Sequence, residues 1–378
     1  MKKNLIQSRV HTALAASCLA ALTAFTASAQ AKDLNIAVVG PITGPVAQFG
    51  DQVKDGIEVA AKAINDQGGV LGRKIKLVYI DDACEPKQAP AAANRVLNDK
   101  IQFVIGHVCS GTSVAASPIY EESGVLMITG GSTAPEVTEG KGYHYVFRTI
   151  GRTDQQAPIA TKYIVEKLKP KKIAILHDKQ TYGYGIASAM HDSLTKAGMK
   201  IQVYQSINLG EIDYSAVLTH LKSEGIDFVY FGGNHPEMGL LIRQAAEIGL
   251  KARFMGSEGV GNGEINAIAG DAVEGMLVTL PPDFAADPKN KAVVQAFADQ
   301  KRDPTGAMTL TSYAAVQALA AAMTDTKSTD PANVAAWLRS HTVDSVIGPI
   351  AWDRQGDLKN FEFPVYVWHK DGSKTLAQ

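Results

Sequence analysis

Two stretches of the chain join a short apolar run to small residues with hydroxyl groups, which suits the binding of an anion. Residues 103–113 run from the apolar FVIG into Ser110, Thr112 and Ser113. We interpret them as a buried strand, a tight turn and a helix start, whose free N–H groups and partial positive charge point into the turn. Residues 127–135 repeat the pattern. Because parallel strands end at one edge of a sheet, both loops are predicted to meet there.

Simpler or competing explanations of these residues stay open at this stage. Ser110 or Thr112 could serve only as a helix cap. Asp81 and Asp82 could form a catalytic or metal-binding pair, but neighbours in a strand point to opposite faces, which favours a strand-end turn.

Catalytic motifs are absent from the sequence. It contains no GxGxxG, GxxxxGK[ST], GxSxG or HExxH. His107 and His177 each end a predicted strand, yet no Ser or Cys nucleophile with a third partner accompanies either of them. We therefore expect no cofactor, no metal and no enzymatic activity.

Alternating strand and helix patterns must position these loops. Such alternation predicts parallel sheets with right-handed crossovers. Strands are predicted at residues 34–41, 76–82, 103–106, 172–178, 201–204, 228–233 and 254–256, and helices at 53–64, 89–97, 159–168, 186–197 and 240–248. The remainder is mostly helical, at 292–297, 310–323 and 334–338, before a final alternating strand at 361–368.

The first 29 residues read as a cleavable signal peptide. Lys2, Lys3 and Arg9 supply a basic start, residues 13–27 an apolar core too short to span a bilayer, and residues 27–29 (ASA) a cleavage site. The mature protein is therefore expected outside the cytoplasm.

Composition after the signal excludes several classes of partner. The chain has 37 basic and 38 acidic residues, and removing three basic residues with the signal leaves 34 against 38, a net charge of −4. This balance does not favour nucleic acid or a membrane surface. A hydrophobic content of 46% without a second long apolar run indicates a soluble protein, and the length suggests two domains. The two remaining cysteines, Cys84 and Cys109, are expected to form a disulfide, since their number is even and the compartment oxidising.

Several short segments resemble the branched-chain amino-acid-binding proteins of bacterial ABC importers. They follow that family's order over essentially the whole chain after the signal. The segments are residues 44–51, 81–89, 105–110, 177–183, 234–239 and 254–260, and the ending at 352–369.

The resemblance implies the type I periplasmic-binding-protein fold, an α/β protein with two doubly wound parallel-sheet lobes joined by a three-strand hinge. Lobe 1 would comprise residues 32–151 plus 282–361, and lobe 2 residues 152–281 plus 362–378. An L-amino acid, with Leu, Ile or Val expected, would bind between the lobes and pass to an inner-membrane ABC permease. The protein would be periplasmic and would insert into no membrane. We also expect a monomer, because the sequence shows no sustained heptads.

The resemblance also implies roles for the site residues. Ser110, Gly131 and Thr133 would hold the ligand carboxylate, in agreement with the anion site predicted from the helix ends. Glu258 would hold the α-ammonium from the opposite lobe. A charged group from that lobe would make closure depend on the ligand.

Three further residues would surround the ligand side chain: Tyr182, Phe49 and Asn234. Phe49 stands where a Tyr or Trp is familiar in the family, and Asn234 where a Tyr is familiar. These differences keep amino-acid recognition but leave the preferred side chain open among larger aliphatic, aromatic and polar groups. Two other functions stay open as well: a ligand sensor of the same fold, and an exported amidohydrolase.

Overall fold

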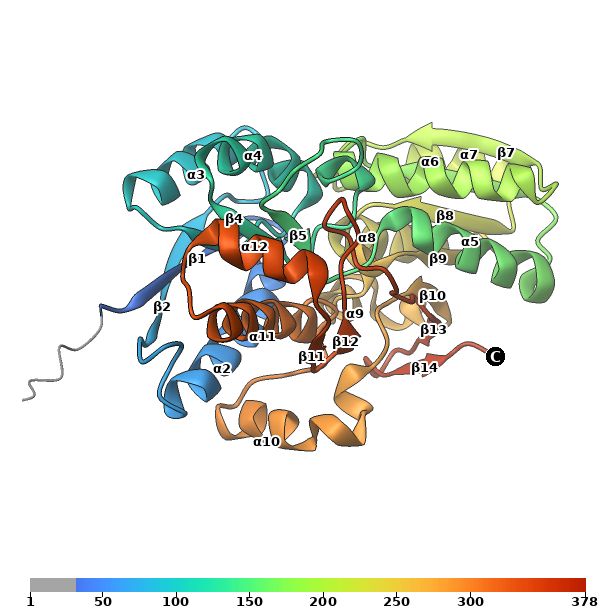
Figure 1. Ribbon diagram of the computed structural model, residues 1–378. Coiled ribbons are helices and arrows are strands. Elements are labelled where there is room, and N and C mark those ends of the chain that lie inside the picture. The colour runs from blue at the N-terminus through green and yellow to red at the C-terminus, as the bar shows by residue number, and fades with distance from the viewer. Residues whose placement is uncertain (1–31) are drawn as a thin grey trace, which may run out of the picture. The chain divides into compact units, whose positions relative to one another are not determined.

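The computed structural model describes residues 32–378, so the predicted signal peptide at residues 1–29 lies outside the described residues. Its first sheet has five parallel strands in the order β2-β1-β3-β4-β5 (Figure 1). The strands are β1 (Leu34–Gly40), β2 (Ile75–Asp81), β3 (Phe103–Gly106), β4 (Leu126–Thr129) and β5 (Val146–Arg148). No helix within residues 32–378 is both long and apolar enough to cross a membrane.

Helices cover both faces of the first sheet, which removes its apolar strands from water. One face packs against α3 (Ala89–Asn98) and α4 (Ser110–Ser123). The other packs against α2 (Ala47–Asp66), α11 (Thr309–Thr326) and α12 (Pro331–Ser340). The late helices of the chain thus return to the first sheet (Figure 1). Their side of the core also takes in α10 (Lys291–Asp299), through Phe297.

The second sheet has seven strands in the order β14-β13-β10-β9-β8-β6-β7. Five are parallel: β6 (Ile173–His177), β7 (Ile201–Ser206), β8 (Phe228–Gly232), β9 (Arg253–Gly256) and β10 (Met276–Thr279). The other two, β13 (Val365–Trp368) and β14 (Lys374–Leu376), are antiparallel and form one edge. The expected α/β fold class is confirmed, with this antiparallel edge as an addition.

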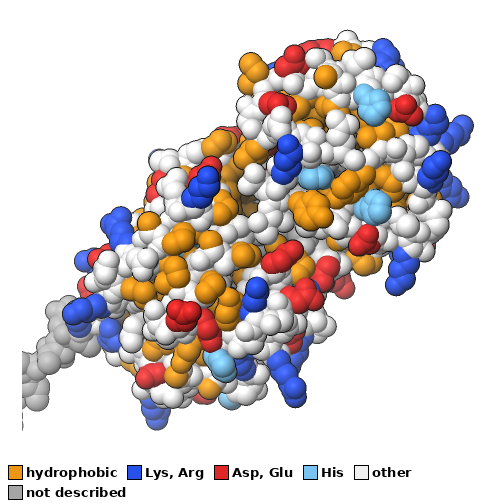
Figure 2. Space-filling model, turned by 90° about the horizontal axis from the view of Figure 1, so that it is seen from above, with side chains coloured by type: hydrophobic (Ala, Val, Ile, Leu, Met, Phe, Trp, Pro, Cys, Tyr) orange, Lys and Arg blue, Asp and Glu red, His pale blue; other side chains and the backbone are white. Residues whose placement is uncertain are grey.

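The second sheet is also covered on both faces. One core cluster packs α5 (Thr153–Tyr163) and α6 (Thr181–Lys196) against it. A second cluster packs α7 (Ser215–Glu224), α8 (His235–Glu247) and α9 (Glu264–Ala269) on the other face. Each sheet is therefore doubly wound and has its own core. Acidic and basic side chains are dispersed over the face shown in Figure 2.

Between the two sheets the chain passes from β5 to α5, from β10 to α10, and from the segment before Phe361 to β13. A small hairpin of β11 (Val343–Ser345) and β12 (Gly348–Ile350) precedes the last passage. The lobe boundaries given above stay a prediction.

The strand predicted at residues 361–368 begins later in the structure than predicted. Residues 361–364 are not part of a strand, and β13 begins at Val365. Pro364, which has no N–H to donate to a ladder, precedes it. Its carbonyl oxygen instead accepts from the Leu280 N–H (3.2 Å).

Candidate functional site

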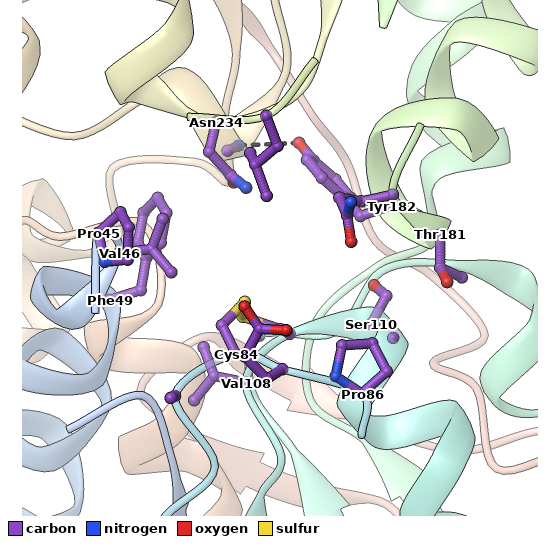
Figure 3. Close-up of a pocket in the computed structure, with 18 of the residues that line it drawn as sticks. Pro45, Val46, Phe49, Cys84, Pro86, Val108, Ser110, Thr181, Tyr182 and Asn234 are labelled. Carbon is purple, nitrogen blue, oxygen red and sulfur yellow. Dashed lines mark hydrogen bonds between the residues drawn. A yellow bond between two sulfur atoms is a disulfide. The ribbon is translucent and has the colours of Figure 1, made fainter. Parts of the chain in front are cut away.

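A cleft of about 160 Å³ is lined by residues of the loops and helix starts next to both sheets. Six of the seven predicted site residues line it: Phe49, Ser110, Gly131, Tyr182, Asn234 and Glu258. In Figure 3, Tyr182 and Asn234 lie on one side of an open centre, and Val108 and Ser110 on the opposite side. Phe49 and Val46 close a third side.

The turn between β3 and α4 forms the first wall of the cleft. It depends on Gly106, whose φ is 132°, since a Cβ there would lie 2.0 Å from the Val39 carbonyl oxygen. Ser110 is the first residue of α4, as the sequence pattern predicts, and is buried. Its hydroxyl oxygen accepts from the backbone N–H groups of Thr133 (3.3 Å) and Ala134 (3.1 Å). The two hydroxyl-rich loops therefore meet, at the carboxyl ends of β3 and β4.

The capping alternative for this turn is wrong, and two of the three hydroxyl groups named in the anion prediction do not line the cleft. The N-cap is Cys109, with no side-chain capping bond. Thr112 Oγ1 donates to the Cys109 carbonyl oxygen (2.9 Å), and Ser113 Oγ pairs with Ser132 Oγ (2.7 Å). Both side chains are buried, and of the three residues only Ser110 lines the cleft.

The Cys84–Cys109 disulfide joins the turn after β2 to the start of α4. Both cysteines line the cleft. The predicted bond thereby fixes the residue directly before Ser110.

Glu258 forms the second wall, at the end of β9 in the other sheet. It is 1% exposed. Its Oε1 accepts from Thr133 Oγ1 (2.7 Å) and its Oε2 from Gln156 Nε2 (2.5 Å). Burial raises the pKa of the carboxyl, and these two hydrogen bonds oppose the rise only in part. No salt bridge to Glu258 occurs within residues 32–378.

Thr133 is the predicted site residue that does not line the cleft. Its hydroxyl donates to Glu258 and its backbone N–H to Ser110. Thr133 thus joins the group predicted for the carboxylate to the group predicted for the ammonium.

The remaining wall combines aromatic and amide side chains. The Tyr182 hydroxyl pairs with Ser257 Oγ (2.6 Å) and accepts from the Gly259 N–H (2.9 Å). The Phe49 ring meets the His235 ring edge to face, with centroids 5.4 Å apart. Asn234 is the N-cap of α8, but its side chain makes no capping bond. An apolar group enclosed by these side chains would lose its contact with water.

A buried ion pair supports the loop that carries Gly131 and Thr133. Arg148 Nε donates to Asp357 Oδ1 (2.5 Å), and its guanidinium also donates to the carbonyl oxygens of Ser132 (2.8 Å) and Ala134 (3.1 Å). Arg152 donates to the other oxygen of Asp357 (2.9 Å). Burial of Asp357 opposes its ionisation, but the Arg148 charge and these hydrogen bonds hold its pKa below the usual range.

The residues considered for catalysis have structural contacts. Asp81 accepts from the Ile42 and Ala83 N–H groups (2.9 and 2.8 Å), as a strand-end turn requires. Asp82 Oδ2 lies 2.6 Å from His107 Nδ1, and the other ring nitrogen lies 3.0 Å from the Tyr120 hydroxyl. His177 packs on Tyr184 and Tyr204. None of the four lines the cleft formed by the described residues.

Sequence reasoning missed several residues of the site. Val108 lies within the opening motif, so its place in the turn could have identified it. Met308 precedes α11, far from the site in sequence, and no local pattern marks it. Gln156, which contacts Glu258, lies in α5 but before the predicted helix at residues 159–168, and no local pattern marks it.

Known proteins share the sequence and fold of this chain. Residues 33–373 match the family model described as periplasmic binding protein. The leucine-, isoleucine-, valine-, threonine-, and alanine-binding protein of Pseudomonas aeruginosa is 50% identical over 99% of both chains. The Leu/Ile/Val-binding protein of Escherichia coli is 50% identical over 97% of this chain and 98% of its own.

A solved structure is similar to this chain in fold. The leucine-binding protein LivK of Thermotoga maritima matches with a TM-score of 0.84 and 29% identity, over 91% of this chain and 98% of that one. The expected type I fold agrees with this likeness. The chain belongs to the periplasmic binding protein family.

Proposed function

We propose that this protein is a periplasmic solute receptor that captures a branched-chain or related L-amino acid in the cleft and delivers it to an inner-membrane ABC permease. The observation that carries the proposal is the buried carboxylate of Glu258, which faces the hydroxyl-lined turn of Ser110 and lacks a cation among the described residues.

The two walls complement the two charges of an amino acid. The start of α4, with the Ser110 hydroxyl and the loop at Gly131, offers donors and the positive end of a helix to a carboxylate. Glu258 offers a negative charge to an ammonium. An unpaired buried carboxylate costs free energy, which an ammonium at the site would offset.

The side-chain wall favours an apolar ligand. Phe49, Val46, Val108 and Tyr182 enclose the cleft, and burying an aliphatic side chain there would contribute roughly 2 kcal/mol. The names of the two relatives at 50% identity support Leu, Ile and Val as ligands. Asn234 adds an amide to this wall, so a ligand with a small polar side chain also fits.

A receptor fits the site better than an enzyme does. The residues nearest to the expected ligand charges, Ser110 and Glu258, belong to different walls, and the Ser110 hydroxyl accepts from two backbone N–H groups. No general base contacts that hydroxyl among the described residues. An enzyme would convert an amide or peptide, whereas a receptor returns its ligand unchanged.

Isothermal titration against single L-amino acids tests the proposal. The purified protein is first unfolded and refolded to remove any carried ligand. We expect saturable one-to-one binding of Leu, Ile or Val and none of their D-enantiomers. Binding confined to an aromatic or strongly polar amino acid would refute the branched-chain assignment. Silence across the whole panel would refute amino-acid capture.

Transport is tested separately from binding. Deletion of the gene should abolish uptake of labelled leucine at low external concentration, and a plasmid copy should restore it. Unchanged uptake, together with a lost transcriptional response to leucine, would instead identify a sensor.

A further inference from the structure

Gln156 contacts the Glu258 carboxylate from a different element of the chain. It is in the first turn of α5, directly after the passage from β5, and is fully buried. It does not line the cleft formed by the described residues. Its Nε2 donates to Glu258 Oε2 (2.5 Å), and its Oε1 accepts from Thr279 Oγ1 (2.6 Å). Thr279 is the last residue of β10, at the start of the second passage between the sheets.

The contacts of the amide fix its orientation. If the amide were flipped, its oxygen would face an oxygen of the ionised Glu258 carboxylate, and two acceptors would meet without a proton. In the observed orientation the Thr279 hydroxyl satisfies the amide oxygen, so the NH₂ group is directed at Glu258. A hydrogen bond to the ionised form of a buried acid favours that form.

We infer that Gln156 is a positioning residue that keeps Glu258 ionised and directs its carboxylate toward the ligand ammonium. The inference rests on the proposed function, because it assumes that an ammonium binds at Glu258. Thr279 takes part by holding the amide in the required orientation.

Few other groups that titrate face Glu258. From α6 and β8 these are the phenols of Tyr182 and Tyr230, and burial raises the pKa of both well above the usual value, so they stay neutral near pH 7. The loop after β4 contributes the neutral Thr133, and α5 contributes Gln156. The charge at this point of the site is therefore set by Glu258.

The test is the pH profile of L-leucine affinity, measured by titration calorimetry from pH 5.5 to pH 8 for the parent and for Gln156→Met. The ligand keeps its own charges over this range. Loss of the amide should raise the pKa of Glu258, so the fall in affinity at low pH begins at a higher pH. For a pKa rise of about one unit, the variant loses up to about tenfold more affinity than the parent at the low-pH end.

Two further variants keep the inference falsifiable if Gln156→Met folds poorly. Thr279→Val removes only the hydroxyl that orients the amide, and should shift the profile in the same direction by less. Thr149→Val is the matched control, because it removes a buried hydroxyl that donates to the Thr311 carbonyl oxygen (2.7 Å) and has no bond to Glu258. Its leucine affinity should begin to fall at the same pH as that of the parent.

The outcomes separate the inference from the function. Parallel profiles for the parent, Gln156→Met and Thr279→Val would overturn the role of Gln156 and leave amino-acid binding intact. A parent protein that binds leucine at no pH would overturn the proposed function, and the inference with it.

Discussion

Two buried carboxylates of this protein lie in opposite electrostatic environments. Asp357, 3% exposed, accepts from Arg148 and Arg152. Glu258, 1% exposed, accepts from two neutral side chains, a hydroxyl and an amide. The pKa of Asp357 is held low by its guanidinium partners despite burial, whereas burial raises the pKa of Glu258.

We interpret Asp357 as a structural group and Glu258 as a group that binds the ligand. Asp357 has its cations in the chain, and the pair supports the loop that carries Gly131. Glu258 has hydrogen bonds but no cation among the described residues, and it lines the cleft. A bound ammonium would place a positive charge beside Glu258, as Arg148 does beside Asp357. The following predictions test this contrast, from the largest expected effect to the smallest.

Removal of the cation from the structural pair should cost the most. Arg148→Met leaves Asp357 buried with only Arg152, and should lower the free energy of unfolding by about 3 to 5 kcal/mol, measured in guanidinium chloride. Lys62→Met is the control, since its exposed pair with Asp66 should contribute less than about 1 kcal/mol. If both variants lowered the free energy of unfolding equally, the buried pair would have no special structural role.

Neutralising the carboxylate of the cleft should affect binding instead. Glu258→Gln should weaken leucine binding by about 3 kcal/mol, roughly two orders of magnitude, because the ammonium would be buried without a counter-charge. The ligand-free variant should be no less stable than the parent at pH 8, since the raised pKa shows that burial disfavours the charged form. Undiminished affinity would exclude Glu258 from the ammonium site.

The two carboxylates should also differ in their dependence on pH. An ammonium binds the ionised form of Glu258, so affinity should be full above the pKa of the free protein and should fall by about tenfold per pH unit below it. Asp357, with a lowered pKa, adds stability that is present above the unfolded value and is lost only as pH falls through the folded value. Calorimetry and thermal unfolding from pH 4 to pH 8 should show leucine affinity declining first. If stability declined before affinity, the contrast would not hold.

The smallest expected effect concerns the ligand side chain. Asn234→Tyr replaces an amide in the wall with a ring and fills part of the cleft. Preference for branched aliphatic ligands over threonine should then increase by about 1 kcal/mol in competition titrations. An unchanged ranking of ligands would show that Asn234 does not contact the side chain.

Local sequence patterns predicted the part of the site that is formed by the turn after β3 and the loop after β4. The strand at residues 103–106 was correct to the residue and a helix does start within the predicted stretch, because a buried apolar run, a glycine with positive φ and small polar residues act over a few positions. The meeting of this turn with the loop after β4 followed from the rule for parallel strands.

Contacts between distant segments could not be predicted in this way. Arg148 and Asp357 are 209 positions apart, and Gln156 and Glu258 are 102 apart. No periodicity links such positions, because the fold alone brings them together. β5 and β10 were not predicted as strands either; unlike β3 and β9, neither of these short runs ends in a glycine that marks a turn.

One calorimetric comparison tests the central claim most directly. L-leucine is titrated beside 4-methylpentanoate, which lacks the ammonium, and L-leucinamide, which lacks the carboxylate. If Glu258 binds the ammonium and the Ser110 turn binds the carboxylate, leucine binds one to one and both analogues bind at least about a hundredfold more weakly. Binding of 4-methylpentanoate as tight as that of leucine would contradict the account, because Glu258 would then have no cation to bind.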